Sequence, residues 1–265
     1  MSTMTQTQTQ TTAAQAQSAT ITPKAGFLSK APIIGRRELF SYFVSPIAYV
    51  AMFLFLLATG WAFSRDFMPG QPAGMRTLFD WMVWFLVFII PVLSMGLMAQ
   101  EWASGTIETM MTAPVGETDL VAGKFLGAFG FLLVLLSPTL LYVVLLSIYG
   151  PPDYGPILSG YVGIVLVCAL FLAVGLFCSS LTRSQVVAAV LAAAILAAVT
   201  IVPWVAAGQA SLGNFWRQVT DQTVLIRYGV FSKGIIDTGN LVFFIAATLV
   251  FLFLTVKVVE SRRWR

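Results

Sequence analysis

The sequence predicts an all-α integral membrane protein with six transmembrane helices, and both its composition and its apolar runs indicate this class. Of the 265 residues, 58% are hydrophobic and only 10% are charged, and the mean hydropathy is +0.87. Soluble domains carry roughly a quarter charged residues. Six apolar runs are long enough to cross a hydrocarbon core, which needs about 20 helical residues: residues 46–63, 79–99, 120–149, 157–178, 186–206 and 241–259.

The region before the first span divides into two pieces. Residues 1–26 are rich in Thr, Gln, Ala and Ser without apolar periodicity, so we expect a disordered cytoplasmic tail. This tail lacks the basic stretch followed by an apolar stretch that marks a cleavable signal. Residues 27–44 mix apolar and basic side chains and predict a helix lying along the inner membrane face. The pair Ser45 and Pro46 predicts the start of the first span, and residues 27–265 are expected to form one membrane domain.

The distribution of Lys and Arg predicts that both termini are cytoplasmic. With that orientation, ten basic residues lie on the inner side: Lys24, Lys30, Arg36, Arg37, Lys124, Arg183, Lys257, Arg262, Arg263 and Arg265. Five lie on the outer side: Arg65, Arg76, Arg217, Arg227 and Lys233. Cytoplasmic loops carry the excess of positive charge, so the net charge of +4 reflects membrane orientation and gives no reason to expect nucleic acid as a partner.

The loops and breaks along the chain are unequal. The third span is long enough to kink at Pro138, and the links around 150–156 and 179–185 are short. Residues 208–240 are long for a structureless connection. We expect short extracellular helices there, re-entrant or interfacial, with Gly213, Gly229 and Gly234 as breaks. Gly123, Gly127, Gly130 and Ala128 give the start of the third span a small face that suits close helix approach.

An acidic interruption, EWASGTIETMMTAPVGETDL, follows the second span at residues 101–120. Projected as one helix, residues 101–114 are amphipathic, with Glu101 and Glu108 on the polar face. Acids on a cytoplasmic surface gain nothing from anionic lipid, so a protein partner is one reading of that face, and simple solvation is the other. We expect span two to end near Ser104, a short helix over Thr106–Ala113, and Thr118 to cap span three, with Asp119 in its first turn.

Few residues are available for chemistry. The chain has no His, and Cys168 and Cys178 stand ten residues apart on one predicted helix, roughly 15 Å, so they cannot pair with each other. A metal site of the usual type, a membrane-embedded enzyme and an ion-coupled carrier are therefore disfavoured, since the last two need ionisable residues at depth in the spans.

Three stretches carry a resemblance to a known family. The string EWASGTIETMMTAPV, followed by Gly123 and Lys124, resembles the cytoplasmic loop of ABC-2-type transporter permeases. The stretches RELFSYFVSPIAY from Arg37 and GIIDTGNLVFF from Gly234 resemble the gliding-motility-associated subgroup of that family. The resemblance implies that the loop holds a coupling helix seated in a cytoplasmic ATPase. The coupling positions it implies are Glu101, Gly105, Thr106, Glu108, Met111, Pro114 and Lys124, and the interfacial elbow would be Arg36, Arg37 and Glu38.

The same resemblance implies the partners and the role. They are two copies of a cytoplasmic ABC ATPase, a second permease that is identical or related, and membrane lipid. A phosphate-binding G-x-x-x-x-G-K-S/T is absent at Gly123, because its first glycine position is Thr118 and its hydroxyl position is Phe125. The chain is thus expected to bind no cofactor and not to be an enzyme, with ATP and Mg on the partner. The expected role is ATP-driven export across a bacterial inner membrane. The alternative is a membrane scaffold or mechanotransmitter, in gliding motility or envelope assembly, that moves no solute.

Overall fold

The computed structural model describes residues 30–66, 74–105, 116–149, 152–207 and 223–263, and every regular element in these ranges is a helix. In chain order the elements are α2 (Ala31–Val44), α3 (Pro46–Asp66), α4 (Arg76–Ser94), α5 (Gly96–Ser104), α7 (Glu117–Leu136), the 3₁₀ helix η1 (Ser137–Thr139), α8 (Leu140–Tyr149), α9 (Tyr154–Leu181), α10 (Gln185–Ala207), α12 (Val224–Phe231) and α13 (Thr238–Arg263). The predicted all-helical class is therefore confirmed for this part of the chain.

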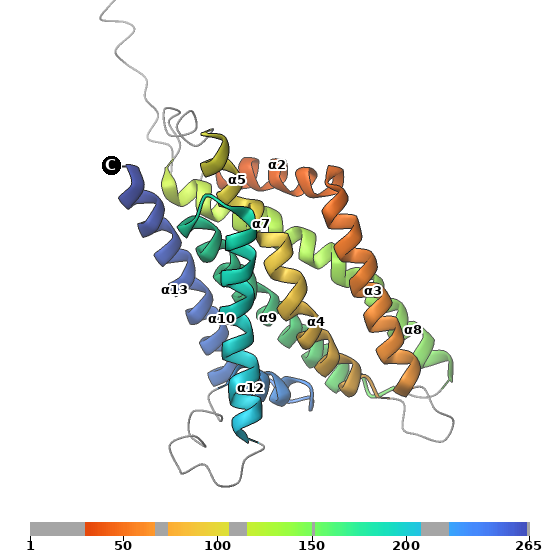
Figure 1. The fold of residues 1–265 in the computed structure, drawn as a ribbon. Coiled ribbons are helices and arrows are strands. Elements are labelled where there is room, and N and C mark those ends of the chain that lie inside the picture. Colours follow the sequence, from red (N-terminus) through yellow and green to blue (C-terminus); the bar gives the residue numbers. More distant parts are fainter. Residues whose placement is uncertain (1–29, 67–73, 106–115, 150–151, 208–222, 264–265) are drawn as a thin grey trace, which may run out of the picture.

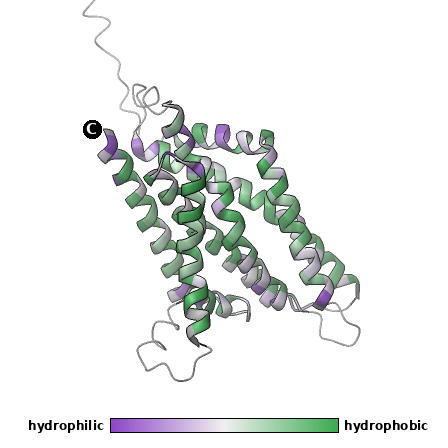
Figure 2. Ribbon diagram, viewed as in Figure 1, coloured by the Kyte–Doolittle hydropathy of each residue, from purple (hydrophilic) through white to green (hydrophobic). Residues whose placement is uncertain are grey.

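The six predicted spans are confirmed as helices long and apolar enough to cross a membrane. They are Pro46–Arg65, Arg76–Ser104, Glu117–Ile148, Tyr154–Leu181, Gln185–Val202 and Thr238–Arg262. Figure 2 shows hydrophobic residues along their lengths and hydrophilic residues in α2 and near the helix ends. Because the number of spans is even, α2 and the C-terminal end of α13 lie at the same end of the bundle (Figure 1), which we call the α2 end.

The chain turns sharply between α2 and the first span. α2 lies across the α2 end of the bundle, while α3 runs along the bundle (Figure 1). Ser45 leaves the helical conformation, with φ −81° and ψ 123°, and α3 begins at the next residue, Pro46. Proline suits the first turn of a helix because the missing N–H would have no partner there. The predicted start of the first span is thus confirmed.

α9 is the central helix, and α4, α5, α7, α10, α12 and α13 all pack against it. Two of its glycines allow very close approach. A Cβ built on Gly160 would lie 2.4 Å from the Phe79 ring, and one on Gly175 would lie 2.1 Å from Ser94 Oγ. Larger residues at these positions would overlap with α4, so the glycines set the distance between the two central spans.

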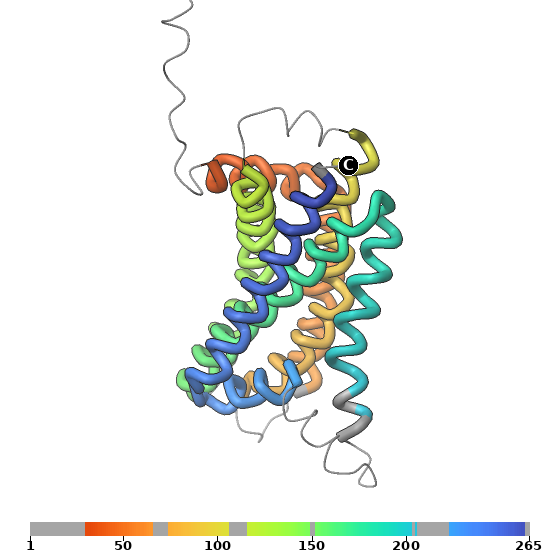
Figure 3. The backbone as a smooth tube through the Cα atoms, turned by 90° about the vertical axis from the view of Figure 1, so that its left-hand side faces the viewer, coloured from red at the N-terminus to blue at the C-terminus, as the bar shows by residue number. Residues whose placement is uncertain are grey.

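The outer helices expose large apolar side chains. Phe53 of α3, Val190 of α10 and Val242 of α13 are each more than half exposed. Such surfaces suit hydrocarbon or another apolar helix. α12 lies at the opposite end of the bundle from α2 (Figures 1 and 3), where Ser159 Oγ of α9 donates a 2.7 Å hydrogen bond to the Phe231 carbonyl. This short helix is therefore attached to the central span.

Two spans are interrupted. The third span consists of α7, η1 and α8, and Pro138 lies in the 3₁₀ turn between them, where a kink was predicted. The second span consists of α4 and α5, which are separated at Met95, four residues after Pro91. It ends at Ser104, as predicted.

Two smaller predictions are wrong. Thr118 does not cap span three, because α7 already begins at Glu117 after an extended Gly116 that offers no side-chain oxygen; Asp119 lies in the first turn as expected. Gly229 is not a break, since it lies inside α12 with open space around it. The packing of α12 against α9 outweighs the low helix propensity of a single glycine. Gly234, with φ 92°, does follow the end of that helix, while Gly213 lies outside the described residues.

Candidate functional site

Three helices meet at the α2 end of the bundle and bring together distant parts of the sequence. α5 ends at Ser104, and Gly105 after it takes a left-handed conformation, φ 71°, that favours glycine. α7 begins with Glu117 and Asp119 in its first turn, where the helix dipole favours acids. Residues 106–115 therefore connect two helix ends that both lie beside α2 (Figure 1).

α2 packs directly on α7 because glycines remove the side chains that would separate the two helices. A Cβ built on Gly127 would lie 2.6 Å from the carbonyl oxygen of Gly35, and one on Gly123 would lie 2.6 Å from Ile34 Cβ. Such distances are not tolerated, so larger residues would force α2 away. The small face predicted at Gly123 and Gly127 is confirmed, and α2 is the helix that occupies it.

This packing places three charged side chains in contact, which we call the charge cluster: Lys124, Glu101 and Glu38. Lys124 Nζ lies 2.8 Å from Glu101 Oε1 and 3.5 Å from Glu38 Oε2. The lysine side chain is only 3% exposed, and the two glutamates are 17% and 22% exposed. A buried ammonium is tolerated only when its charge is paired. One buried cation from α7 therefore ties together α5 and α2.

The opposite flank of α5 is held by the C-terminal helix. The Arg262 guanidinium of α13 lies over the Trp102 ring, 4.8 Å from its centre, and Arg262 Nη2 donates to the Leu181 carbonyl at the end of α9. A guanidinium over an indole face is an attractive cation–π arrangement. α5 is thus joined to α7 by the salt bridge of Glu101 and to α13 by the contact of Trp102.

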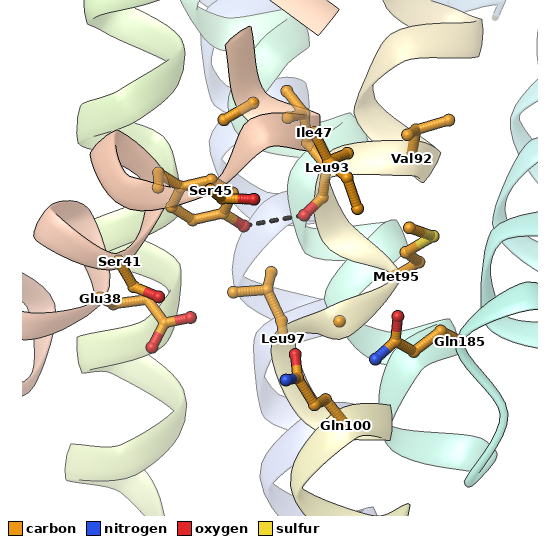
Figure 4. A pocket seen from close by; sticks show the side chains of 13 residues that line it. Glu38, Ser41, Ser45, Ile47, Val92, Leu93, Met95, Leu97, Gln100 and Gln185 are labelled. Carbon is orange, nitrogen blue, oxygen red and sulfur yellow. Dashed lines mark hydrogen bonds between the residues drawn. The ribbon is translucent and has the colours of Figure 1, made fainter. Parts of the chain in front are cut away.

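Two cavities lie beside the charge cluster. The larger, about 290 Å³, is lined by all three cluster residues. The smaller, about 110 Å³, lies where Ser41 of α2, Gln100 of α5 and Gln185 of α10 converge (Figure 4). Glu38, Ser41, Gly96 and Gln100 line both. The side of α5 that faces α2 is therefore only partly packed.

Tyr42 fixes α2 to the second span across the smaller cavity. Its hydroxyl donates a 2.8 Å hydrogen bond to the Leu93 carbonyl of α4, drawn as the dashed line in Figure 4. Burial, reinforced by the neighbouring Glu38 carboxylate, raises the pKa of Tyr42 far above its ordinary value. The phenol consequently stays protonated and remains a donor.

The structure assembles part of the predicted coupling set. Glu101, Lys124 and the elbow residue Glu38 form the charge cluster, and Gly105 ends α5. Arg37 lines the larger cavity, while the Arg36 guanidinium lies 5.6 Å from the Phe40 ring centre. The remaining predicted positions lie outside the described residues: Thr106, Glu108, Met111 and Pro114.

Sequence reasoning missed the contacts that surround α5. Arg262 was used only as an orientation signal, and Tyr42 and Trp102 were given no role, although all three make contacts between elements here. The only available signal was their amphipathic chemistry near span ends. Pairing between residues so far apart in the sequence has no periodic signature.

The described residues contain no group of three or more His, Cys, Asp or Glu side chains that could hold a metal ion. What the site offers is a set of salt bridges and hydrogen bonds between helix ends. Such contacts transmit position and orientation from one helix to another.

A comparison with known families adds to this geometry. The sequence matches the family described as ABC-2 family transporter protein over residues 1–259. No curated protein matches the chain. Members of this family are the membrane components of ABC transporters and normally work with an ATP-binding subunit. Since the match spans nearly the whole chain, this multi-pass membrane protein belongs to the ABC-2 transporter family and is the permease component of an ABC transporter.

Proposed function

We propose that this permease exports its substrate and couples that export to ATP hydrolysis on a separate cytoplasmic ATPase through the α2 end of the bundle. The observation that carries the proposal is the buried Lys124, which pairs with Glu101 and Glu38. Glu101 belongs to α5, which precedes residues 106–115, Lys124 belongs to α7, which follows them, and Glu38 belongs to α2. A force applied to that segment therefore reaches span two, span three and α2 together.

The segment itself supplies the contact with the ATPase. Residues 106–113 are expected to form the coupling helix, with Glu108 offering charge and Met111 offering an adaptable apolar surface to a groove on the ATPase. Glu101 is held by Lys124, so its role is to keep the end of α5 in place rather than to meet the partner. Docking and force transmission thus belong to different residues of one motif.

The orientation and the assembly follow from this proposal. The α2 end faces the cytoplasm of a bacterial inner membrane, with both termini on that side, because the ATPase must reach residues 106–115. Two ATPases act on two permeases, identical or related. The exposed apolar surfaces of α3, α10 and α13 leave room for a second bundle as well as for lipid.

Arginine substitutions in the segment test docking. Glu108→Arg and Thr106→Arg are expected to abolish co-purification of the ATPase and its stimulation by the permease, whereas Lys233→Glu, an exposed charge at the opposite end, should have no effect. Undiminished binding by the Arg variants would overturn the proposal. So would a cysteine at Thr109 that reacts only with impermeant reagents added from outside.

Reconstituted vesicles separate export from the alternative scaffold role, whose support is the resemblance to the gliding-motility-associated subgroup. ATP-dependent movement of a solute across the bilayer is the expected result. ATP-dependent remodelling of a bound protein without solute movement would favour the scaffold and would leave the docking site in place.

A further inference from the structure

We propose that Ser179 of α9 is a positioning residue. It keeps the backbone hydrogen bonds between α4 and α5 interrupted, so that this junction of span two acts as a hinge. The interruption of span two has an unusual cause. Met95 separates the two helices although its φ of −56° and ψ of −37° are ordinary helical values. The backbone dihedral angles of Met95 therefore do not explain the break. The pattern of backbone hydrogen bonds around Met95 explains it.

The hydroxyl of Ser179 occupies the place of ladder bonds. In an uninterrupted helix the Ala99 N–H donates to the Met95 carbonyl, and the Met98 N–H donates to the Ser94 carbonyl. Here both N–H groups donate to Ser179 Oγ at 3.0 Å, and Ser179 Oγ donates to the Met95 carbonyl at 2.9 Å. Insertion of a side chain into the ladder is a recognised cause of a helix kink.

The insertion is complete and buried. A serine hydroxyl has one proton to donate and two lone pairs to accept with, and all three are used. Ser179 is 0% exposed. One turn earlier on α9, Gly175 lets Ser94 of span two approach closely, since a Cβ there would overlap the Ser94 hydroxyl. This close approach brings Ser179 within reach of the junction.

α5 has both the anchors and the space that a hinged segment needs. Its far end carries Glu101 and Trp102, which contact Lys124 of α7 and Arg262 of α13. The cavity of about 290 Å³ lies between α5 and α2. When Ser179 withdraws, the Ala99 N–H can return to the Met95 carbonyl and α5 becomes continuous with α4. The permease can therefore adopt two bonding patterns at one junction, and the claim that coupling uses them rests on the proposed function.

The size of the expected movement follows from helix geometry. α5 has 9 residues. A change of about 20° at the base of a helix about 13 Å long moves its far end by about 5 Å. Segment 106–115 continues from that end, so the hinge sits where force from a partner would enter span two.

The test compares Ser179→Ala with Ser180→Ala. Ser180 is the neighbouring residue and equally buried, but its hydroxyl donates within its own helix, to the Phe177 carbonyl at 2.7 Å. Spin labels on cysteines at Ala103 of α5 and at Val190 of α10, which packs on α4 and α5, report the hinge in the full-length permease in lipid nanodiscs. The native Cys168 and Cys178 are fully buried, so the spin label reacts with the two introduced cysteines.

Ser179→Ala should shift the mean label distance by about 5 Å, while Ser180→Ala and the hydroxyl-retaining Ser179→Thr keep it. If Ser179→Ala fails to fold, Ser179→Cys, which keeps the volume but bonds weakly, should give a broadened or intermediate distance. An unchanged distance in the Ala variant, or in the Cys variant used in its place, overturns the hinge.

The coupling part is read separately, with the co-expressed ATPase bound. Ser179→Ala should lower permease-dependent stimulation of ATP hydrolysis by about threefold, and Ser180→Ala should not. If Ser179→Ala shifts the label distance but keeps full stimulation of ATP hydrolysis, the hinge is supported and the role of Ser179 in coupling is overturned. Loss of ATPase binding by wild-type permease would instead count against the proposed function, because the label distances do not depend on it.

Discussion

Removing the buried cation of the charge cluster is expected to destabilise the α2 end more than any exposed ion pair could. At an effective dielectric constant of about 20, the attraction of Lys124 to Glu101 at 2.8 Å is about 6 kcal/mol, and to Glu38 at 3.5 Å about 5 kcal/mol. Most of this attraction offsets the desolvation of the lysine. Breaking a buried pair on one side costs about 3–5 kcal/mol, and because the glutamates are partly exposed we expect about 2–4 kcal/mol for Lys124→Met.

A double-mutant cycle measures the pair itself. Lys124→Met, Glu101→Gln and the double variant are compared by unfolding in mixed detergent micelles, with helix content followed by circular dichroism. The sum of the two single losses in free energy of unfolding should exceed the loss in the double variant by about 1–2 kcal/mol. The reason is that each single change removes the same interaction and leaves a partner unpaired.

A matched control lies on α13. Lys257 and Glu260 form a 2.7 Å pair whose side chains are 54% and 46% exposed. Lys257→Met should cost less than about 1 kcal/mol, since solvent screens the pair. If Lys124→Met costs no more than Lys257→Met, or if the cycle is additive, the charge cluster does not hold the helices together and the reasoning fails.

Two further substitutions test the helix contacts, each with an internal comparison. Gly127→Ala places a Cβ 2.6 Å from the Gly35 carbonyl oxygen and should lower the free energy of unfolding by about 1–3 kcal/mol through overpacking. Gly130→Ala should be neutral in the same unfolding assay, because the nearest neighbour of its Cβ is a side-chain atom at 3.5 Å. Equal losses would contradict the close approach of α2 and α7. Ser159→Ala removes the hydrogen bond to the Phe231 carbonyl, so it should lower the free energy of unfolding by about 1–2 kcal/mol and raise the rate of hydrogen exchange in α12. An unchanged exchange rate would mean that this hydrogen bond does not attach α12 to α9.

Much of the fold was available from the sequence. The six spans, the turn at Pro46, the end of span two near Ser104 and the interruption at Pro138 follow from local chemistry: apolar length, the missing proline N–H and the conformational freedom of glycine. The predicted cap at Thr118 and break at Gly229 failed because helix ends shift by a residue or two and packing overrides local preference.

Less of the candidate site was available. The resemblance singled out Glu38, Glu101 and Lys124 as separate positions, without indicating that they touch. The glycines at 123 and 127 indicated a close helix neighbour but not that it would be α2. Ser179 carried no signal, since a serine near the end of a span is ordinary.

What the sequence determined by itself was which segments are helices in an apolar solvent, because backbone hydrogen bonds within a helix and hydrophobic length are properties of neighbouring residues. What only the tertiary structure decided was which helices touch. The contact of Lys124 with Glu38 and the hydrogen bonds of Ser179 to Met95 and Met98 each join residues more than 80 positions apart, and no local pattern encodes such contacts. The physical reason is that buried charges and backbone groups are satisfied by whatever packing places beside them.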